Sequence, residues 1–343
     1  MNSIWAQLAT HFWLAFAVSA VLAYPIWKLL LLTKSRQTVS QYAPEGHQAK
    51  QGTPTMGGLI IMVGYIVTVV ASLFMAGPTG TDYFDRVKPA FLVLAIGFML
   101  IGFVDDFVVP RVFKGKRGLG WKQKIIMQFG LAIFASGLCY GWKLDFPFAA
   151  SMFLILFFSN AYNFSDGLDG LAGTLLLGLV LGIGGIALMT AWMQPIALMV
   201  LPLAGAVIPF LYLNAPPAKV FMGDAGSLPI GAILGLAVSC LTFAPGWSLI
   251  DAVTTLPMAG HSPVNAALIV MSLMMVVELV PVPLQILSVK LRKKKIFPYT
   301  PIHHAFEKAG WPETRVVGMF SLTQLVLSIL AITIVALRCA GVL

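Results

Sequence analysis

Ten long apolar stretches constrain the fold of this chain more than any other feature. They span residues 11–33, 57–76, 88–105, 125–142, 146–163, 171–190, 195–213, 226–243, 264–288 and 317–340. A helix needs about 20 apolar residues to cross the hydrocarbon core of a bilayer. Of the 343 residues, 59% are hydrophobic and only 10% are charged, which is more apolar surface than a soluble core can bury. We therefore predict one all-α integral membrane domain over residues 1–343, with about ten transmembrane helices.

The basic residues predict how these helices are oriented. Cytoplasmic loops retain Lys and Arg, and numbering the loops alternately places all but four of the 22 Lys and Arg on one side. Both termini are then expected outside and five loops in the cytoplasm. Residues 1–10 contain no Lys or Arg, so the first stretch is expected to remain as a helix rather than to be a cleaved signal. The net charge of +9 reflects this topology, or attracts polyanions to the cytoplasmic face.

Five aspartates lie near helix ends on the predicted cytoplasmic side, namely Asp105, Asp106, Asp166, Asp169 and Asp224. Carboxylates at membrane depth are costly and are usually paired, metal-bound or functional. The adjacent Asp105 and Asp106 close the third stretch and point about 100° apart on a helix, so we expect one to face a phosphate or metal and the other a basic group. The alternative is a solvated pair that caps the loop.

A second polar cluster follows the fifth stretch. Asn160, Asn163, Asp166 and Asp169 recur at every third residue. Gly167 and Gly170 indicate that the helix ends there and that the loop folds the later acids back toward a site. An ordinary polar loop would explain the glycines but not the regular amides and acids.

Asp224 opens the eighth stretch within the sequence Gly-Asp-Ala-Gly-Ser. An ordinary helix N-cap has this appearance. Beside four other acids on the same predicted face, however, Asp224 becomes a candidate ligand for Mg²⁺, which prefers oxygen ligands and phosphates. The three cysteines, Cys139, Cys240 and Cys339, lie in apolar stretches without metal-ligand spacing and are predicted to be core residues.

Two further segments have anion-binding chemistry. Residues 50–58, Lys-Gln-Gly-Thr-Pro-Thr-Met-Gly-Gly, bring a cation, hydroxyl groups and flexible backbone to a helix N-terminus. His303 and His304 follow a basic run at 290–295, and we expect them to hydrogen-bond phosphate or sugar or to be structural. Glu278 lies inside a predicted span before Pro281 and Pro283, which predict a bend there.

Taken together, the motifs at 52–58, 105–106, 160–170, 221–224 and 301–304 resemble the polyprenyl-phosphate N-acetylhexosamine-1-phosphate transferases. Within that superfamily the chain is most similar to the branch that transfers phospho-N-acetylmuramoyl-pentapeptide. The resemblance implies ten helices in the bacterial cytoplasmic (inner) membrane, outward termini and an active-site cleft at the cytoplasmic face. It implies the substrates UDP-MurNAc-pentapeptide and undecaprenyl phosphate, the cofactor Mg²⁺, and the products lipid I and UMP.

The resemblance also implies roles for individual residues. Asp224 matches the magnesium ligand, and Asp105 matches the acid proposed to deprotonate the lipid phosphate. The expected catalytic residues are Asp105, Asp106, Asp166, Asp169 and His303. The expected substrate-binding residues are Lys50, Thr55, Lys122, Asn160, Asn163, Asn214, Phe221, Gln285 and His304. The family suggests a homodimer in contact with membrane lipids, and no nucleic-acid partner is expected.

Two departures bear on the donor substrate. The muramoyl-peptide branch usually has three consecutive histidines, and Ala305 takes the third place here. It also usually has a lysine within three residues of the aspartate pair, where this chain has Val108, Val109 and Pro110. A transferase that uses UDP-N-acetylglucosamine on the same lipid is therefore the alternative. An ion-coupled transporter is a distant third, because transporters place ionisable groups near the membrane midplane.

Overall fold

The structure, a computed structural model, describes residues 4–33, 52–75, 82–113, 116, 118–189, 193–243 and 262–342. Within these ranges the regular elements are all helices, and none is a strand, which confirms the predicted all-α class. The helices are α1 (Ile4–Leu32), α2 (Gly58–Met75), α3 (Asp82–Phe103), η2 (Val104–Val108), α4 (Val109–Val112), α5 (Trp121–Tyr140), α6 (Phe146–Phe164), α7 (Leu171–Leu188), α8 (Gln194–Asn214), α9 (Asp224–Thr242), α11 (Ser262–Leu279), α12 (Pro281–Arg292), α13 (Ile302–Lys308) and α14 (Glu313–Cys339).

Nine of the predicted apolar stretches each coincide with one of these helices, and the stretch 264–288 covers α11 and most of α12. By length and hydropathy, 8 helices in the described residues are able to cross a membrane. The described apolar part of α2, Gly58–Phe74, is shorter than the others, and α5 is made more polar by residues such as Lys122, Lys124 and Gln128. The prediction of helices at these ten places is therefore confirmed, whereas a count of about ten spans stays a prediction.

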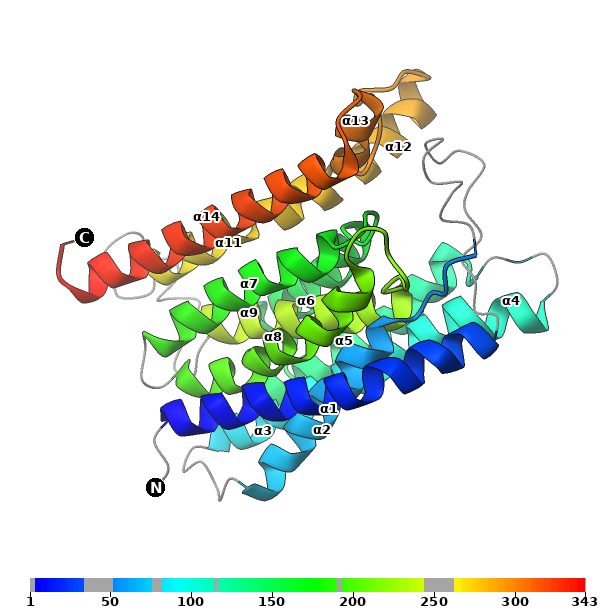
Figure 1. The fold of residues 1–343 in the computed structure, drawn as a ribbon. Coiled ribbons are helices and arrows are strands. Elements are labelled where there is room, and N and C mark those ends of the chain that lie inside the picture. The colour runs from blue at the N-terminus through cyan, green and yellow to red at the C-terminus, as the bar shows by residue number, and fades with distance from the viewer. Residues whose placement is uncertain are drawn as a thin grey trace.

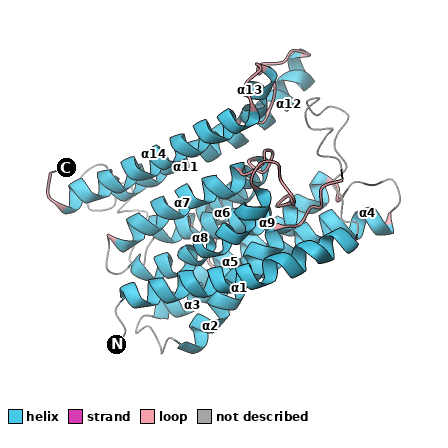
Figure 2. Ribbon diagram, viewed as in Figure 1, coloured by secondary structure: helices cyan, strands magenta, loops and turns pink. Residues whose placement is uncertain are grey.

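The long helices run roughly side by side, and their loops gather at the two ends of the bundle (Figures 1 and 2). Helix α1 begins and α14 ends at one end of the bundle. Helices α4, α12 and α13 lie at the opposite end, beside the loops that carry the polar motifs. Helices α11 and α14 form a pair along one flank, and α14 packs on α7.

Helix α9 forms the centre of the bundle and is buried along nearly its whole length. Its closest neighbour is α6, and small residues bring the two backbones together. A side chain at Gly231 would meet the backbone of Phe158 and Ser159, and one at Gly235 would meet the backbone of Leu154 and Ile155. Four-residue spacing of small residues is a common way to pack helices closely within a bilayer. This packing fixes the position of Asp224, the first residue of α9.

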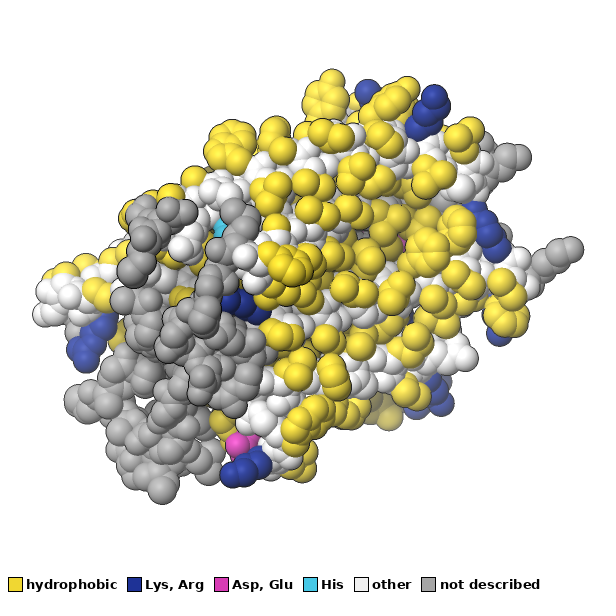
Figure 3. Space-filling view, turned by 90° about the horizontal axis from the view of Figure 1, so that it is seen from below, with side chains coloured by type: hydrophobic (Ala, Val, Ile, Leu, Met, Phe, Trp, Pro, Cys, Tyr) yellow, Lys and Arg dark blue, Asp and Glu magenta, His cyan; other side chains and the backbone are white. Residues whose placement is uncertain are grey.

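The outer surface of the bundle is apolar. One face, seen in Figure 3, is covered in its described part mostly by hydrophobic side chains, and Lys and Arg side chains lie toward its margins. Large exposed side chains include Trp13 on α1, Leu100 on α3 and Phe153 on α6. A contiguous apolar surface of this kind suits contact with lipid rather than with water.

Two helices depart from regular geometry near the polar motifs. The third span does not end at the aspartate pair as the sequence predicted, because the helix continues through η2 and α4 to Val112. Asp105 and Asp106 lie in η2, a π-helical turn in which the N–H of Val109 donates to the carbonyl of Val104. Such turns insert a residue into a helix and are frequent at functional sites. Where Pro281 and Pro283 predicted a bend, the helix is interrupted, since α11 ends at Leu279 and α12 begins at Pro281.

Candidate active site

Two of the sequence motifs lie against each other through their backbones. The N–H of Gly57 donates to the carbonyl of Phe221 at 2.7 Å, and the N–H of Phe221 donates to the carbonyl of Pro54 at 2.9 Å. Thr55 is buried in this junction, and the side chain of Phe221 is half-buried. A side chain at Gly223 would approach the Thr55 hydroxyl, so the first loop lies directly beside the turn that leads into α9.

A cluster of three carboxylates forms where η2 meets the start of α9. Asp105, Asp106 and Asp224 each offer an oxygen, and these oxygens lie within 4.8 Å of one another. The N–H of Leu119 donates to Oδ1 of Asp105 at 2.5 Å, and the N–H of Ala225 donates to Oδ2 of Asp106 at 3.3 Å. The two adjacent aspartates thus have different hydrogen-bond partners, whereas the expected division between a phosphate or metal and a basic group stays a prediction.

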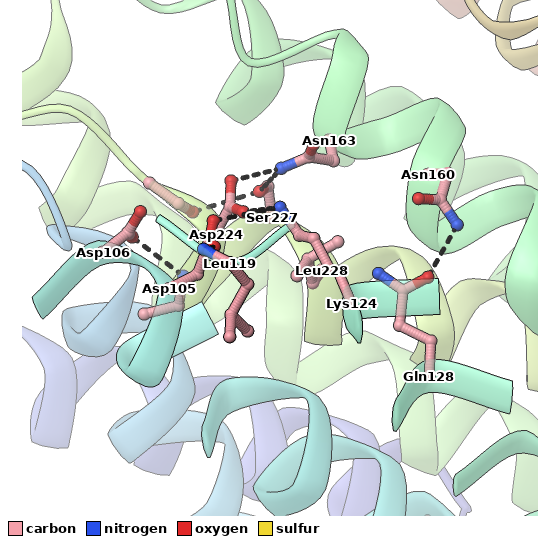
Figure 4. A network of polar contacts seen from close by, with 12 residues as sticks. Asp105, Asp106, Leu119, Lys124, Gln128, Asn160, Asn163, Asp224, Ser227 and Leu228 are labelled. Atoms are coloured by element: carbon pink, nitrogen blue, oxygen red, sulfur yellow. Dashed lines mark hydrogen bonds and ion pairs between the residues drawn. The ribbon is translucent and has the colours of Figure 1, made fainter. Parts of the chain in front are cut away.

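Lys124, on the first turn of α5, supplies the cation of this cluster. Its Nζ donates to Oδ2 of Asp105 at 3.2 Å and also to Oδ2 of Asp224 (Figure 4). All three side chains are partly accessible, with exposed fractions of 19% for Lys124, 15% for Asp105 and 18% for Asp224. If the acids are all ionised, one ammonium leaves the cluster with an excess of negative charge that a divalent cation would offset.

Asp224 does not act as an N-cap. Gly223 holds the N-cap position of α9 without a side-chain hydrogen bond, and its φ of 71° is one that glycine adopts readily. Oδ1 of Asp224 instead accepts a hydrogen bond from Nδ2 of Asn163 at 2.7 Å, and the same amide nitrogen lies 2.7 Å from Oγ of Ser227. The carboxylate therefore faces α5 and α6 rather than its own helix end.

Asn160 lies one turn before Asn163 on α6 and has a partner from α5. Nδ2 of Asn160 donates to Oε1 of Gln128 at 2.9 Å and to the carbonyl of Leu156 at 2.8 Å (Figure 4). Gln128 is fully buried. Because Gln128 lies one turn after Lys124, these contacts extend the polar network by one helical turn from the carboxylates.

The loop after α6 folds back as the glycines predicted. Oδ2 of Asp166 accepts a hydrogen bond from the N–H of Gly223 at 3.0 Å. Burial raises the pKa of the Asp166 carboxyl well above its usual range, and the negative charges of Asp224 and Asp169 act in the same direction, against the hydrogen bond from Gly223. Asp166 therefore joins the carboxylate cluster to the loop that precedes α7.

The side chains of Asp169 and Asn214 accept hydrogen bonds from backbone N–H groups of neighbouring loops and do not face the carboxylate cluster. Both are 3% exposed. Oδ2 of Asp169 accepts from the N–H of Ala218 at 2.9 Å, and Oδ1 of Asn214 accepts from the N–H of Gly170 at 2.9 Å. Their side chains thereby fasten the loop after α6 to the loop after α8.

The two histidines of α13 reach the same loop from another side. A side chain at Gly167 would approach Nε2 of both His303 and His304. Nδ1 of His303 lies 2.8 Å from Oε2 of Glu278, and both side chains are fully buried. Nδ1 of His304 lies 2.6 Å from Oε2 of Glu307. The histidine helix is thus fastened to the end of α11 and lies against the Asp166 loop.

Two other predicted substrate-binding residues, Gln285 and Lys122, do not join the carboxylate cluster. Gln285 accepts hydrogen bonds from the N–H groups of Ile296 and Phe297, so it braces the loop after α12. Lys122 is exposed and lies over the ring of Trp121, with Nζ 5.6 Å from the ring centroid. Lys50 falls outside the described residues.

Sequence reasoning missed Lys124, Gln128 and Ser227 as members of the site. Lys122 and Lys124 are two residues apart and point about 200° apart on a helix, so only one of them can face the bundle. Gln128 lies four residues after Lys124 and therefore on the same face. That spacing groups Lys124 with Gln128 on one face of the helix, but only the packing of α5 in the bundle decides that this face, and not the face of Lys122, meets the site.

The donor set fits a magnesium ion. Three carboxylates converge within 4.8 Å, and the surrounding groups are amides, hydroxyls and backbone N–H groups rather than thiols. Mg²⁺ prefers oxygen ligands and is commonly bound by one or two carboxylates together with phosphate oxygens. The fold and the site together define an integral membrane protein whose carboxylates and lysine suit the chemistry of phosphate groups.

Comparisons with known proteins agree with this class. The profile for Glycosyl transferase family 4 matches residues 89–242, and the phospho-N-acetylmuramoyl-pentapeptide-transferase signature 1 matches residues 50–62. The phospho-N-acetylmuramoyl-pentapeptide-transferase of Bacillus subtilis (strain 168) is 33% identical over 344 residues, covering 94% of this chain and 95% of the relative. The protein of that name from Acetivibrio thermocellus is 34% identical, covering 93% and 92% of the two chains.

The chain therefore belongs to the phospho-N-acetylmuramoyl-pentapeptide-transferase family. It is a transferase and a multi-pass protein of the bacterial cytoplasmic membrane. The resemblance noted in the motifs is confirmed over nearly the whole length of the chain.

Proposed function

We propose that this protein transfers phospho-MurNAc-pentapeptide from UDP-MurNAc-pentapeptide to undecaprenyl phosphate, forming lipid I and releasing UMP. The observation that carries the proposal is the cluster of Asp105, Asp106 and Asp224 around Lys124. This cluster lies at the end of the bundle that also holds α4, α12 and α13. Both substrates are anionic at the reacting groups, so transfer requires charge neutralisation and alignment more than covalent chemistry. The family names of the relatives support the donor.

Asp224 is the proposed magnesium ligand, with Asp105 and Asp106 beside it. Bound there, Mg²⁺ would offset the negative charge of the donor pyrophosphate. The first turn of α9 fixes Asp224, and the hydrogen bond from Asn163 orients its carboxylate. The chain thus holds the carboxylates in place before any substrate arrives, which lowers the cost of reaching the reactive geometry.

The proposed chemical step is direct displacement. An oxygen of the undecaprenyl phosphate attacks the β-phosphorus of the donor, a new phosphorus–oxygen bond forms, and the bond to the bridging oxygen breaks so that UMP leaves. A phosphate acceptor is already largely ionised near pH 7, so the step needs no strong base. Asp105 is proposed to take any remaining proton or to assist at the metal.

The remaining predicted residues are proposed to position the donor. Asn163 bonds Asp224, Asp166 bonds the turn before α9, and Asn160 lies one helical turn from Asn163, while His303 and His304 approach the Asp166 loop from α13. Asp169 and Asn214 are proposed to act by shaping the loops that hold the nucleoside. Lys50, Thr55, Lys122, Phe221 and Gln285 are kept as proposed contacts of the wider cleft.

The proposed orientation places this end of the bundle in the cytoplasm and both termini in the periplasm. Soluble UDP-linked donors are cytoplasmic, and the loops around the site carry most of the Lys and Arg. The start of α1 and the end of α14 lie at the other end of the bundle (Figure 1). A homodimer is proposed from the family resemblance alone.

The decisive experiment measures UMP release from the purified full-length protein in detergent. The reaction contains undecaprenyl phosphate and Mg²⁺, with either UDP-MurNAc-pentapeptide or UDP-GlcNAc as donor. Turnover with the muramoyl-pentapeptide donor alone is expected. Turnover with UDP-GlcNAc alone would show that the protein uses the alternative donor and would connect Ala305 on α13 with that choice. No turnover with either donor would contradict the proposed reaction.

A further inference from the structure

Lys124 bonds the two carboxylates that lie on opposite helices of the site. Its ammonium donates to Oδ2 of Asp105, from η2, and to Oδ2 of Asp224, from α9. With an exposed fraction of 19%, it is only partly removed from water. It therefore acts as the cation that keeps the carboxylates together.

The other oxygen of each of these two carboxylates accepts a hydrogen bond that holds the side chain in place. Oδ1 of Asp105 accepts the N–H of Leu119 at 2.5 Å, and Oδ1 of Asp224 accepts the amide of Asn163 at 2.7 Å. The Oδ2 atoms, which Lys124 bridges, are therefore where a divalent cation shared by Asp105 and Asp224 would compete with the ammonium. Two cations a few ångströms apart in a partly buried site repel each other strongly.

We infer that Lys124 is a displaceable counter-ion: it holds Asp105 and Asp224 together and leaves their Oδ2 atoms when a divalent cation binds there. Lysine suits this role because its compact ammonium sits on a long flexible stem, so it can move several ångströms without moving α5. Lys124 bonds both carboxylates, whereas Lys122, two residues earlier, faces away over Trp121.

A second part of the inference rests on the proposed function. Once released from the carboxylates, the Lys124 ammonium faces whatever anion is bound beside the metal. A nucleoside diphosphate would then stabilise the displaced position of Lys124 while its phosphates also bind the metal. Metal and diphosphate should therefore bind cooperatively, and the coupling should pass through Lys124.

The test measures metal binding without turnover. Mn²⁺, a paramagnetic substitute for Mg²⁺, is titrated into the full-length protein in detergent, and free Mn²⁺ is followed by electron paramagnetic resonance. Lys124→Met is expected to bind Mn²⁺ on the order of tenfold more tightly, because the competing charge is gone. Lys122→Met removes the same charge from the same helix and is the matched control, with an expected change of less than about twofold.

Unchanged or weaker Mn²⁺ binding by Lys124→Met, in protein that elutes as the wild type does from size-exclusion chromatography, would overturn the inference. A second measurement needs no variant. The wild-type protein is treated briefly with an amine-reactive reagent, and modification of Lys124 and Lys122 is compared by peptide mass spectrometry. Saturating Mg²⁺ is expected to raise the labelling of Lys124 relative to Lys122, and an unchanged ratio would contradict the displacement.

Adding UDP separates this inference from the proposed reaction. UDP is expected to tighten Mn²⁺ binding by the wild type more than by Lys124→Met. Equal tightening in both would remove the coupling role of Lys124 while leaving the reaction intact. If UMP release is absent but Lys124 is displaced by metal, the proposed reaction fails and the inference about Lys124 stands.

Discussion

At the scale of single residues, Asp224 shows how a common local pattern carries an uncommon role. An aspartate in the first turn of a helix usually stabilises that helix through its N–H groups. Here the carboxylate turns away and bonds Lys124 and Asn163 from two other helices. The stabilisation that α9 does not receive from a side-chain cap is supplied by its burial along the centre of the bundle.

We expect Asp224→Asn to lower Mg²⁺-dependent UMP release by on the order of 10²-fold or more, because the amide cannot carry the charge that a metal ligand needs. The Asn side chain has nearly the same shape, so the melting temperature in detergent should stay close to that of the wild type. The control is Asp145→Asn, which alters the N-cap aspartate of α6, whose Oδ1 accepts from Phe148. Full activity in Asp224→Asn would exclude it as the metal ligand.

At the scale of elements, the contact between α6 and α9 places the amide of Asn163 against the carboxylate of Asp224. Asn160 and Asn163 project from α6, and Asp224 opens α9. The two helices approach closely because Gly231 and Gly235 have no side chains between the backbones. Any residue that separates the helices should therefore alter both stability and the site.

Gly235→Leu is expected to destabilise the protein by about 1–3 kcal/mol, the usual cost of overpacking, and to reduce activity. Its Cβ would meet the carbonyl oxygen of Leu154 and the Cα of Ile155, which are backbone atoms and cannot rotate away. Gly318→Leu on α14 is the matched control, since a Cβ there meets nothing within 4 Å. The measurement is thermal unfolding in detergent, and equal melting temperatures for the two variants would contradict the packing argument.

The sequence predicted the long helices well, because their signal is a run of apolar residues that each helix carries by itself. It did not predict that the third span continues beyond Asp106 through a π-helical turn, because the apolar run stops there while the helix does not. Nor did it predict Lys124 as the partner of Asp105 and Asp224. Which of two nearby lysines faces the site depends on how α5 is rotated against α3 and α9, and that is a property of packing.

The candidate site, like the fold, could be predicted only in part from the sequence. The motifs predicted polar residues near helix ends on one side of the membrane, and Asp105, Asp106, Asp166, Asn163 and Asp224 do lie together. The pattern could not distinguish side chains that face the cluster from those that brace its loops. Asp169, Asn214 and Gln285 are hydrogen-bonded to backbone of neighbouring loops, which only the folded chain brings near them.

At the scale of the whole molecule, the bundle has one polar end with the candidate site and one end at which α1 begins and α14 ends (Figure 1). Cys139 and Cys240 are buried as predicted, but Cys339 is exposed at that second end, so the prediction of a core residue was wrong for Cys339. A membrane-impermeant maleimide is therefore expected to label the native protein at Cys339 from outside the cell. Cys339→Ser should abolish that labelling.

The opposite end supplies the complementary test of topology. In the Cys339→Ser background, Lys116→Cys places a thiol at an exposed position between α4 and α5. This thiol should react with the membrane-impermeant maleimide only after the membrane has been permeabilised. Labelling of this position in intact cells would reverse the proposed orientation, and with it the side from which the donor reaches the carboxylates.

The burial of α9 has a mechanical consequence. The apolar windows of α1 and α14 are 17% and 28% buried within the protein, so these helices meet the lipid, whereas that of α9 is 94% buried. A change in bilayer thickness acts on helices that touch lipid, because these helices tilt or the bilayer around them becomes thicker or thinner. Asp224 is carried by the helix most shielded from such forces, so its carboxylate should keep its place while the outer helices adjust to the membrane around them.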